Sequence, residues 1–356
     1  MTAGARDGTP GAAALLRDWV ASGTCLGGQL FVWADDRVVA DTAVGRSGID
    51  RAAAATDQAR LYCAIKPLTA CCLARAVDEG RASFDDPVSR HLPEFSGHGR
   101  APITIRQLLS HTSGIFDYGL DPYATGFAKV VRLACAYPLS ERSWYGGPRY
   151  NHVIAWNVLA AVAERIYEAD FPAIVERMRV AIPGLPEFRV TRPDPARYVR
   201  SHVLRQGRFA AIPDPPQSRY FATVNPAHGG FGSARDLGLL YAELVRSACG
   251  VGTLLSSPLA TEITSHQSVI DFGLGRDTRG YGLGFMTDVR SDGIGGGWSA
   301  QSFGHAGYIG PYRVIHAFAD TAHRIVVAIR LFSVTAKNNW RMHRLGVAIW
   351  SDLGIG

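Results

Sequence analysis

A cysteine stands three residues before a lysine in the stretch LYCAIKPLTA, residues 61–70, of a chain in which lysine is scarce. Pro67 favours a helix that begins near Cys63, because proline is tolerated in a first helical turn and disrupts later ones. Cys63 and Lys66 would then share one face of that turn, where the helix dipole and the ammonium both favour a thiolate. The spacing therefore predicts a nucleophilic cysteine. A buried cysteine beside a lysine without a catalytic role is the structural alternative.

The pattern of hydrophobic residues predicts strands near both ends of the chain. A helix over 12–23 is followed by a hairpin over 29–45, which turns at the sequence D-D-R. Near the other end, a hairpin over 312–332 is followed by a helix over 338–354. Hairpins at both ends imply one largely antiparallel sheet assembled from the two termini.

The centre of the chain favours helices over 63–80, 103–114 and 151–169. Glycines end the first two, at positions where a C-terminal helix cap belongs. The third shows a stripe that we expect to be buried, formed by Val153, Val158, Ala161, Val162 and Ile166.

These elements together predict the fold class and its division along the chain. We expect an α/β (α+β) fold: an antiparallel sheet flanked by helices, with an inserted, mainly helical region. The whole chain, 1–356, would form a single domain, because 47% of its residues are hydrophobic and can build one large core. Its sheet region would comprise approximately 1–62 and 225–356, and its helical region approximately 63–224.

Charge and composition exclude several classes of function. The formal charge of +6 is spread along the chain rather than gathered in runs, which argues against binding of nucleic acid. A locally basic segment over 188–209 is expected to be a solvated connection rather than a site for an acidic partner. No apolar run is long enough for a signal peptide or a membrane span, so we expect a cytoplasmic protein that does not bind membranes. Irregularly spaced cysteines and the lack of metal or nucleotide motifs predict no cofactor.

Five stretches in this order resemble one enzyme superfamily over nearly the whole chain. They are YCAIKPLTA at 62–70, ITIRQLLSHTSGI at 103–115, PRYN at 148–151, NPAHGGFGSARDL at 225–237 and FGHAGYIG at 303–310. The set is similar to the S-x-x-K, Y-x-N and K/H-x-G motifs of serine β-lactamases, penicillin-binding proteins and class C β-lactamase-like esterases. The resemblance implies a β-lactamase/transpeptidase-like fold with the active site between the sheet and the helical region.

The resemblance also implies roles for individual residues. Cys63 occupies the position of the family's serine nucleophile, Lys66 that of the lysine that relays its proton, and Tyr150 that of the tyrosine that protonates the leaving group. His152 takes the place of the motif asparagine, and we expect it to contact substrate. His305, Ala306 and Gly307 match the esterase-like H-x-G motif and are also expected to bind substrate. The backbone N–H groups of Cys63 and Tyr308 would form the oxyanion hole.

Sulfur in place of oxygen favours transfer of an acyl group over hydrolysis. A thiol beside Lys66 can arrive ionised, and the thioester that it forms reacts readily with an amine. We therefore expect a cysteine-dependent acyltransferase that takes an acyl group from a small-molecule ester or thioester, with a carrier protein as one source, and makes an amide. Small-molecule, antibiotic-like biosynthesis would be its setting.

Three other functions are consistent with the same residues. An esterase or thioesterase would use water as the acceptor and ranks second. A β-lactamase or cell-wall peptidase ranks lower, because the chain shows no export signal and its H-x-G motif lacks the lysine and hydroxyl that hold a substrate carboxylate. A catalytically silent homologue is the fourth, and a serine replaced by design to trap an acyl-enzyme is a further alternative. Selectivity would lie in loops around 118–123, 143–147 and 270–298.

Overall fold

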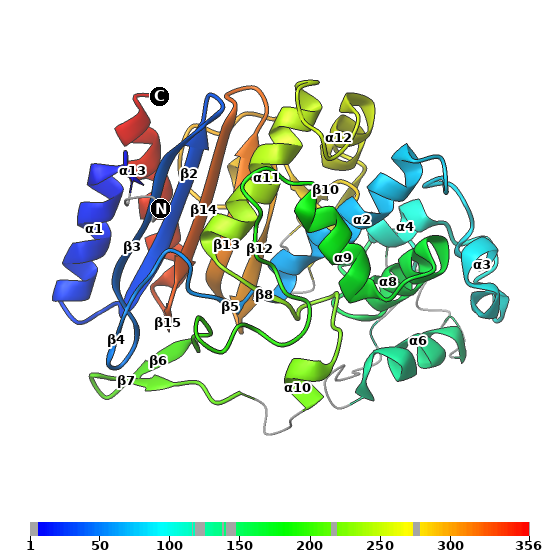
Figure 1. Cartoon of the computed structure of the whole chain (residues 1–356), viewed down its shortest axis with the longest axis horizontal. Helices are drawn as coiled ribbons and strands as arrows, with labels where there is room; N and C mark the ends of the chain where they lie inside the picture. Colours follow the sequence, from blue (N-terminus) through cyan, green and yellow to red (C-terminus); the bar gives the residue numbers. More distant parts are fainter. Residues whose placement is uncertain are drawn as a thin grey trace.

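Strands from both ends of the chain meet in one ten-stranded sheet in the computed structural model, which describes residues 6–115, 117, 125–136, 139, 147–214, 219–272 and 278–355. Its strands run in the order β1-β3-β2-β14-β13-β12-β11-β10-β9, with β4 paired to β3, and every pair is antiparallel. The strands are β1 (Arg6–Asp7), β2 (Gly27–Ala34), β3 (Arg37–Gly48), β4 (Arg51–Ala52), β9 (Ser268–Asp271), β10 (Thr278–Tyr281), β11 (Met286–Thr287), β12 (Ser302–Ile309), β13 (Tyr312–Asp320) and β14 (Ile325–Leu331). The predicted fold class is confirmed (Figure 1).

Both predicted hairpins form. β2 and β3 are joined by Asp35 and Asp36, whose φ angles of 47° and 66° suit the tight turn of a two-residue hairpin. β13 pairs with β14 from Ile315 and Arg330 to Asp320 and Ile325. β14 also pairs with β2, which joins the N-terminal and C-terminal hairpins side by side in the centre of the sheet.

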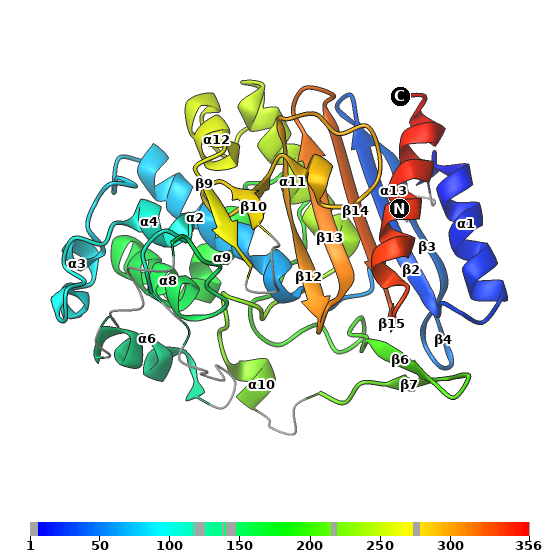
Figure 2. The ribbon, with the colours of Figure 1, turned by 180° about the vertical axis from the view of Figure 1, so that it is seen from behind.

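Helices cover the two faces of this sheet. α1 (Pro10–Ala21) and α13 (Asn338–Leu353) lie together on one face, the face turned toward the viewer in Figure 2. α11 (Ala234–Ala248) packs against β2, β13 and β14 on the other. The strands β2 and β14 are buried along their whole length, as expected for a sheet covered on both sides.

The helical region lies beside the sheet and packs mainly around one central helix. Its elements are η1 (Tyr62–Ile65), α2 (Lys66–Asp78), α3 (Val88–His91), η2 (Pro93–Ser96), α4 (Ile105–Leu109), α6 (Phe127–Ala136), α8 (Ile154–Tyr167), α9 (Phe171–Val180) and α10 (Arg219–Ala222), with α12 (Ser257–Thr264) and η3 (Val289–Ser291) later in the chain. α8 contacts α2, α4, α6 and α9. No helix within the described ranges combines the length and the hydropathy that a membrane span requires.

α8 is more deeply buried than the single stripe predicted from its sequence. Every residue from Ile154 to Ala163 is buried, so the predicted stripe is only part of a helix that is covered on all sides. Neighbouring helices on several sides leave little of its surface for solvent, and the sequence accordingly uses alanine at many of these positions.

Two short pairings complete the fold. β15 (Ser333–Val334) pairs in parallel with β6 (His202–Arg205), which forms a hairpin with β7 (Arg208–Ala211). β5 (Ala59–Arg60) pairs with β8 (Phe231–Gly232). The second pair fixes the chain directly before Cys63 and therefore sets where the cysteine enters the site.

Two helix boundaries differ from the sequence expectation. The α-helix begins at Lys66 rather than near Cys63, because Cys63 belongs to the 3-10 turn η1 that leads into it, and Pro67 lies in the first turn of α2 as expected. The helix predicted over 103–114 is confined to α4. It ends before His111, whose φ of 59° is incompatible with a continued helix.

Candidate active site

The turn that carries Cys63 is held tightly against β12. Tyr62, directly before the cysteine, has a φ of 51°, a left-handed conformation that a bulky residue adopts only when its surroundings impose it. Gly307 provides that contact: a Cβ at this position would collide with the Leu61 carbonyl oxygen and lie 3.0 Å from the Tyr62 Cβ. Only glycine lets β12 approach the cysteine turn this closely.

Lys66 lies behind Cys63, and its side chain is fully buried. Its Nζ donates hydrogen bonds to the Ala227 carbonyl at 2.6 Å and to the His152 carbonyl at 3.2 Å, and a further one to the Cys63 sulfur. It also lies 5.1 Å from the centre of the Tyr150 ring, close enough for a cation–π contact. The three donors of the ammonium therefore all have acceptors, although burial lowers the pKa of Lys66 and the negative charges of Cys63 and Asp117 oppose that effect.

Cys63 is partly buried and has an acidic thiol. Loss of water contact by itself raises the pKa of this thiol, but the Lys66 ammonium and hydrogen bonds from His152 and Tyr150 outweigh that effect and lower the pKa to about 6. At neutral pH the group is therefore a thiolate, the reactive form of cysteine.

Tyr150 and His305 form the opposite side of the site. The Nδ1 of His305 faces the Ala306 carbonyl at 2.9 Å, and because a carbonyl only accepts, Nδ1 carries the proton. Its Nε2 then accepts from the Tyr281 hydroxyl at 3.1 Å, with the Tyr150 hydroxyl at 3.4 Å. Burial, followed by the charge of Lys66, lowers the pKa of His305 to about 3, so this imidazole is neutral.

The Tyr150 hydroxyl keeps its proton. Burial first, and then the negative charge of Cys63, raise the pKa of Tyr150 well above its usual value. Because Tyr281 satisfies His305 at the shorter distance, the Tyr150 hydroxyl is available to the Cys63 sulfur, to which it contributes a hydrogen bond.

The three residues after Arg149 point in different directions. Asn151 is buried and structural: its Nδ2 donates to the Ile115 carbonyl at 3.0 Å and its Oδ1 accepts from the Ala155 N–H at 2.9 Å. His152 is exposed and contributes a hydrogen bond to Cys63, with its ring edge-on to Tyr150 at 4.8 Å between centroids. An exposed imidazole therefore lies beside the thiol.

Two further histidines lie around the site. His111 is buried, and its Nδ1 accepts from the Asn151 N–H at 2.9 Å, which fixes the start of the segment that carries Tyr150. His228 belongs to the loop that supplies the Ala227 carbonyl to Lys66. Burial, and then the charge of Lys66, lower the pKa of His111 well below its ordinary value and that of His228 to about 3.

A cavity of about 600 Å³ opens in front of Cys63. Six predicted site residues line it, namely Cys63, Tyr150, His152, His305, Ala306 and Tyr308. Phe272, Met286 and Trp340 line it as well, and most of its wall is apolar. Arg313, hydrogen-bonded to the Tyr308 hydroxyl at 3.0 Å, is among the polar groups at its edge.

The structure thus brings the predicted site residues together, and their chemical roles stay predictions. Two of them do not line the cavity: Lys66 lies behind Cys63, and Gly307 packs against the cysteine turn. Of the loops expected to set selectivity, 118–123, 143–146 and 273–277 lie outside the described residues. The rest of 270–298 contributes Phe272, Met286 and the ion pair of Arg279 with Asp292.

Several functional groups were missed from the sequence. The Ala227 carbonyl is a backbone atom, so no residue type signals it. Asp117 and Tyr281 reach the site from distant parts of the chain, and neither belongs to the motifs that carried the resemblance. α13 contributes Trp340 to the cavity, which the periodicity of that helix gave no reason to expect.

Comparisons with known proteins agree with this architecture. Residues 12–347 match the beta-lactamase family. Esterase EstB from Burkholderia gladioli is 28% identical over 273 residues, which cover 65% of this chain and 67% of EstB. A penicillin-binding protein homologue from Caulobacter crescentus has the same fold, with a TM-score of 0.81 and 20% identity over 99% of each chain.

A second solved structure is EstCE1, a hydrolase with promiscuous acyltransferase activity. It has a TM-score of 0.78 and 19% identity, over 97% of this chain and 98% of EstCE1. A likeness at this identity concerns the fold alone, whereas the family match extends over almost the whole chain. The chain therefore belongs to the beta-lactamase family.

Proposed function

We propose that the protein is an acyl-transferring enzyme in which Cys63 takes the place of the family's serine. The thiolate receives an acyl group from an ester or thioester donor and passes it to an amine, which yields an amide. The observation that carries this proposal is the position of Cys63 in the cavity wall beside Lys66 and His152, which lower the pKa of its thiol to about 6. The biosynthesis of a small, antibiotic-like molecule is the setting that we propose for it.

In the first step the Cys63 sulfur attacks the donor carbonyl carbon. A carbon–sulfur bond forms and the electron pair of the carbonyl bond moves to the oxygen. We assign the stabilisation of this negatively charged oxygen to the N–H groups of Cys63 and Tyr308. β12 supports this assignment, because its pairing with β13 shifts register between Gly307 and Tyr308, next to the cysteine turn. The bond to the leaving oxygen or sulfur then breaks, and the Tyr150 hydroxyl, which keeps its proton at neutral pH, protonates the leaving group.

In the second step an amine attacks the thioester carbon. The nitrogen must lose a proton as the carbon–nitrogen bond forms, and His152, the exposed base beside the sulfur, can accept it. Transfer of this proton from His152 to the Tyr150 oxygen then restores the hydroxyl that protonated the leaving group in the first step. The carbon–sulfur bond then breaks, which regenerates the thiolate beside Lys66. The mainly apolar cavity wall supports transfer, because it lowers the access of water to the thioester.

Hydrolysis of the same thioester is the second candidate. It uses the same residues with water as the acceptor, and it is favoured by the relationship to EstB, an esterase. The acyltransferase activity of EstCE1 supports the first candidate by the same kind of analogy. A β-lactamase or peptidase activity has less support, since His305 replaces the motif lysine and its neutral ring offers no charge to a substrate carboxylate.

Acylation with a panel of activated aryl esters and thioesters tests the proposal. We expect an adduct of one acyl mass on Cys63, located by peptide mapping, which is absent from Cys63→Ala. A Cys249→Ser variant controls for labelling of the exposed cysteine. If no donor in a broad panel acylates Cys63, both enzymatic candidates are wrong.

Titration with amines then separates transfer from hydrolysis. With an acylating donor present, we expect the ratio of amide to free acid to rise in proportion to amine concentration until amide is the main product. Free acid as the main product at saturating amine would instead assign the protein to the esterases.

A further inference from the structure

The carboxylate of Asp117 holds the start of α8 from a distant point in the chain. Its Oδ1 accepts hydrogen bonds from the N–H groups of Val153 at 3.0 Å and Ile154 at 2.9 Å, and its Oδ2 accepts from the N–H of His152. These are the amides that a helix leaves without partners at its N-terminus. Val153, at the N-cap position, has no side-chain acceptor, so α8 is capped by Asp117 together with Asn151, whose Oδ1 accepts from the Ala155 N–H.

The residue held by this carboxylate is connected to both members of the reactive pair. The carbonyl of His152 accepts from Lys66 Nζ at 3.2 Å, and its imidazole contributes a hydrogen bond to the Cys63 sulfur. With the amide fixed by Asp117, the backbone of His152 cannot shift without loss of these two contacts. One residue thus transmits the position of Asp117 to Lys66 and to Cys63.

Asp117 also differs in charge from the other groups around the pair. The groups that interact with Cys63 or Lys66 are His111, Tyr150, His152, His228, Tyr281 and His305, contributed by the end of α4, the start of α8, the loop before β8, β10 and β12. Asp117 is the carboxylate among the described residues that supports the Lys66 ammonium. Its charge and its hydrogen bonds therefore act in the same direction.

We propose that Asp117 is a positioning residue that locks His152 and, through the His152 carbonyl, the Lys66 ammonium against the Cys63 thiol. This role rests on Cys63 as the nucleophile of the proposed function. It goes beyond that function, because it places the control of thiol reactivity in the segment after the H-T-S-G stretch.

Alkylation of Cys63 with iodoacetamide over a range of pH tests the role without any acyl donor. In Asp117→Asn the single amide oxygen can still cap Val153 and Ile154, but the amide NH₂ would face the His152 N–H, so His152 is released. We expect the midpoint of the alkylation profile to rise by about one pH unit, which corresponds to a roughly tenfold slower reaction at pH 5. Asp117→Glu, which keeps the charge, should recover most of the wild-type profile.

Asp170 offers a matched control. It caps α9 with its own side chain, which accepts from the Ala173 N–H at 2.8 Å, and it is not among the groups that act on Cys63 or Lys66. Asp170→Asn should lower thermal stability by no more than Asp117→Asn and leave the Cys63 profile unchanged. An unchanged profile in folded Asp117→Asn, or an equal shift in Asp170→Asn, would overturn the proposal.

A measurement on the wild-type protein covers the case in which Asp117→Asn does not fold. Hydrogen exchange should be slow at the amides of His152, Val153 and Ile154, because a carboxylate protects them, and exchange as fast as in an unstructured peptide would refute the proposal. The proposed function can fail separately. If no donor acylates Cys63 and the alkylation profile still shifts in Asp117→Asn, Asp117 positions a reactive thiol whose substrate is not an acyl donor.

Discussion

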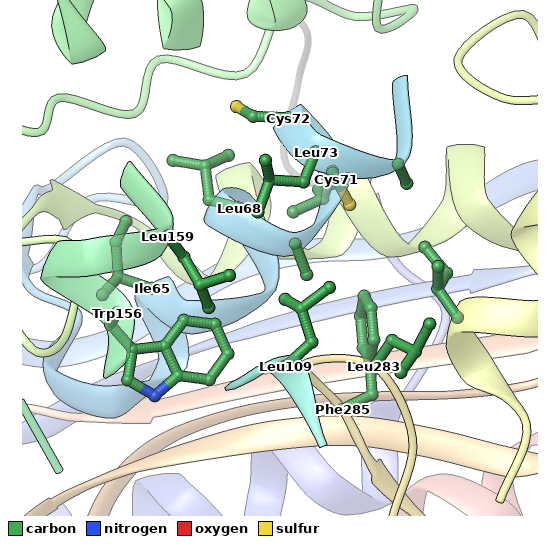
Figure 3. Close-up of a cluster of buried hydrophobic side chains, with 14 of the residues drawn as sticks. Ile65, Leu68, Cys71, Cys72, Leu73, Leu109, Trp156, Leu159, Leu283 and Phe285 are labelled. Atoms are coloured by element: carbon green, nitrogen blue, oxygen red, sulfur yellow. The ribbon is translucent and has the colours of Figure 1, made fainter. Parts of the chain in front are cut away.

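The segment 62–78 holds cysteines in two opposite environments, Cys63 at its start and Cys71 and Cys72 in the middle of α2. Cys63, at the start, has a pKa lowered to about 6, because Lys66, His152 and Tyr150 outweigh the effect of burial. Cys72, three turns later, has a pKa raised by burial to about 12, and burial also raises that of Cys71 well above its ordinary value. Figure 3 shows Cys71 and Cys72 among the side chains of Ile65, Leu68, Leu73, Leu109, Trp156, Leu159, Leu283 and Phe285.

The difference shows what makes a thiol reactive in this fold. All three cysteines lose contact with water, which alone disfavours the thiolate. Only Cys63 has a buried ammonium beside it, and that ammonium is itself kept in place by carbonyls of His152 and Ala227 from two other segments. The positive charge of Arg75 lowers the pKa of Cys72, but by less than burial raises it. Reactivity thus comes from tertiary contacts, not from the helix end alone.

The largest expected effect is a difference in alkylation rate between Cys63 and the two buried cysteines, Cys71 and Cys72. At pH 7, Cys63 should be roughly nine-tenths ionised, whereas Cys71 and Cys72 should be almost entirely protonated. We expect iodoacetamide to modify Cys63 at least about a thousandfold faster, with a rate that falls as the pH drops through about 6. Peptide mapping after timed quenching measures this, and comparable rates at the three sites in folded protein would remove the distinction.

Removal of the Lys66 ammonium should make the Cys63 thiol as unreactive as the buried thiols of Cys71 and Cys72. In Lys66→Met, burial is opposed only by the weaker effects of His152 and Tyr150, so the pKa of Cys63 should rise above that of a free thiol. We expect acylation by an activated ester at pH 7 to slow by about a thousandfold, because the thiolate is lost. Lys129→Met, at an exposed position of α6, is the matched control. Acylation at the wild-type rate in Lys66→Met would exclude the lysine from the mechanism.

A smaller loss is expected when the phenol beside the sulfur is removed. Tyr150→Phe keeps Lys66 and His152 in contact with Cys63, so the thiol should stay ionised at pH 7. Without the hydroxyl, the leaving group has no acid, and we expect kcat for an alkyl ester to fall about a hundredfold. Esters with good leaving groups, such as aryl esters, should lose far less. An equal loss for both kinds of ester would contradict the role of Tyr150 as the acid.

Much of the fold could be read from local patterns, and the contacts at the site could not. The hairpins around Asp35 and Asp320 follow from strand periodicity and turn residues, which act over a few positions. The start of α2 was misplaced, because the 3-10 turn at Cys63 is imposed by the close approach of Gly307, which lies far away in the sequence. The helix predicted over 103–114 failed in the same way, since His111 leaves the helix to bind Asn151.

For the site, the sequence motifs identified the predicted catalytic and binding residues but not the groups that hold those residues in place. Cys63, Lys66, Tyr150 and His305 stand in motifs, whereas Asp117 reaches α8 across a gap of 35 residues or more. The hydrophobic periodicity also underestimated the burial of α8, because the helices that surround it come together only when the helical region packs. Contacts of this kind depend on the order of elements in space, which no local pattern encodes.

The smallest effect is expected at the buried Cys71, where a substitution should change the stability of the protein rather than the reactivity of Cys63. Cys71 is fully buried and packs in the apolar cluster, so Cys71→Ser places a hydroxyl there whose only ready acceptor is a carbonyl of its own helix. We expect the free energy of unfolding to fall by about 1–3 kcal/mol, measured by denaturant unfolding. The alkylation profile of Cys63 should not change, because Cys71 makes no contribution to the charge at that thiol.

Cys63→Ser provides the reciprocal half of that test. A serine there keeps the shape of the turn but stays protonated at neutral pH, so acylation should slow while the denaturant midpoint remains close to that of the wild type. If Cys71→Ser instead slowed acylation as strongly as Cys63→Ser, Cys63 and Cys71 would be coupled through the helix. The reactive thiol would then owe its state to the packing of α2 and not to the ammonium beside it.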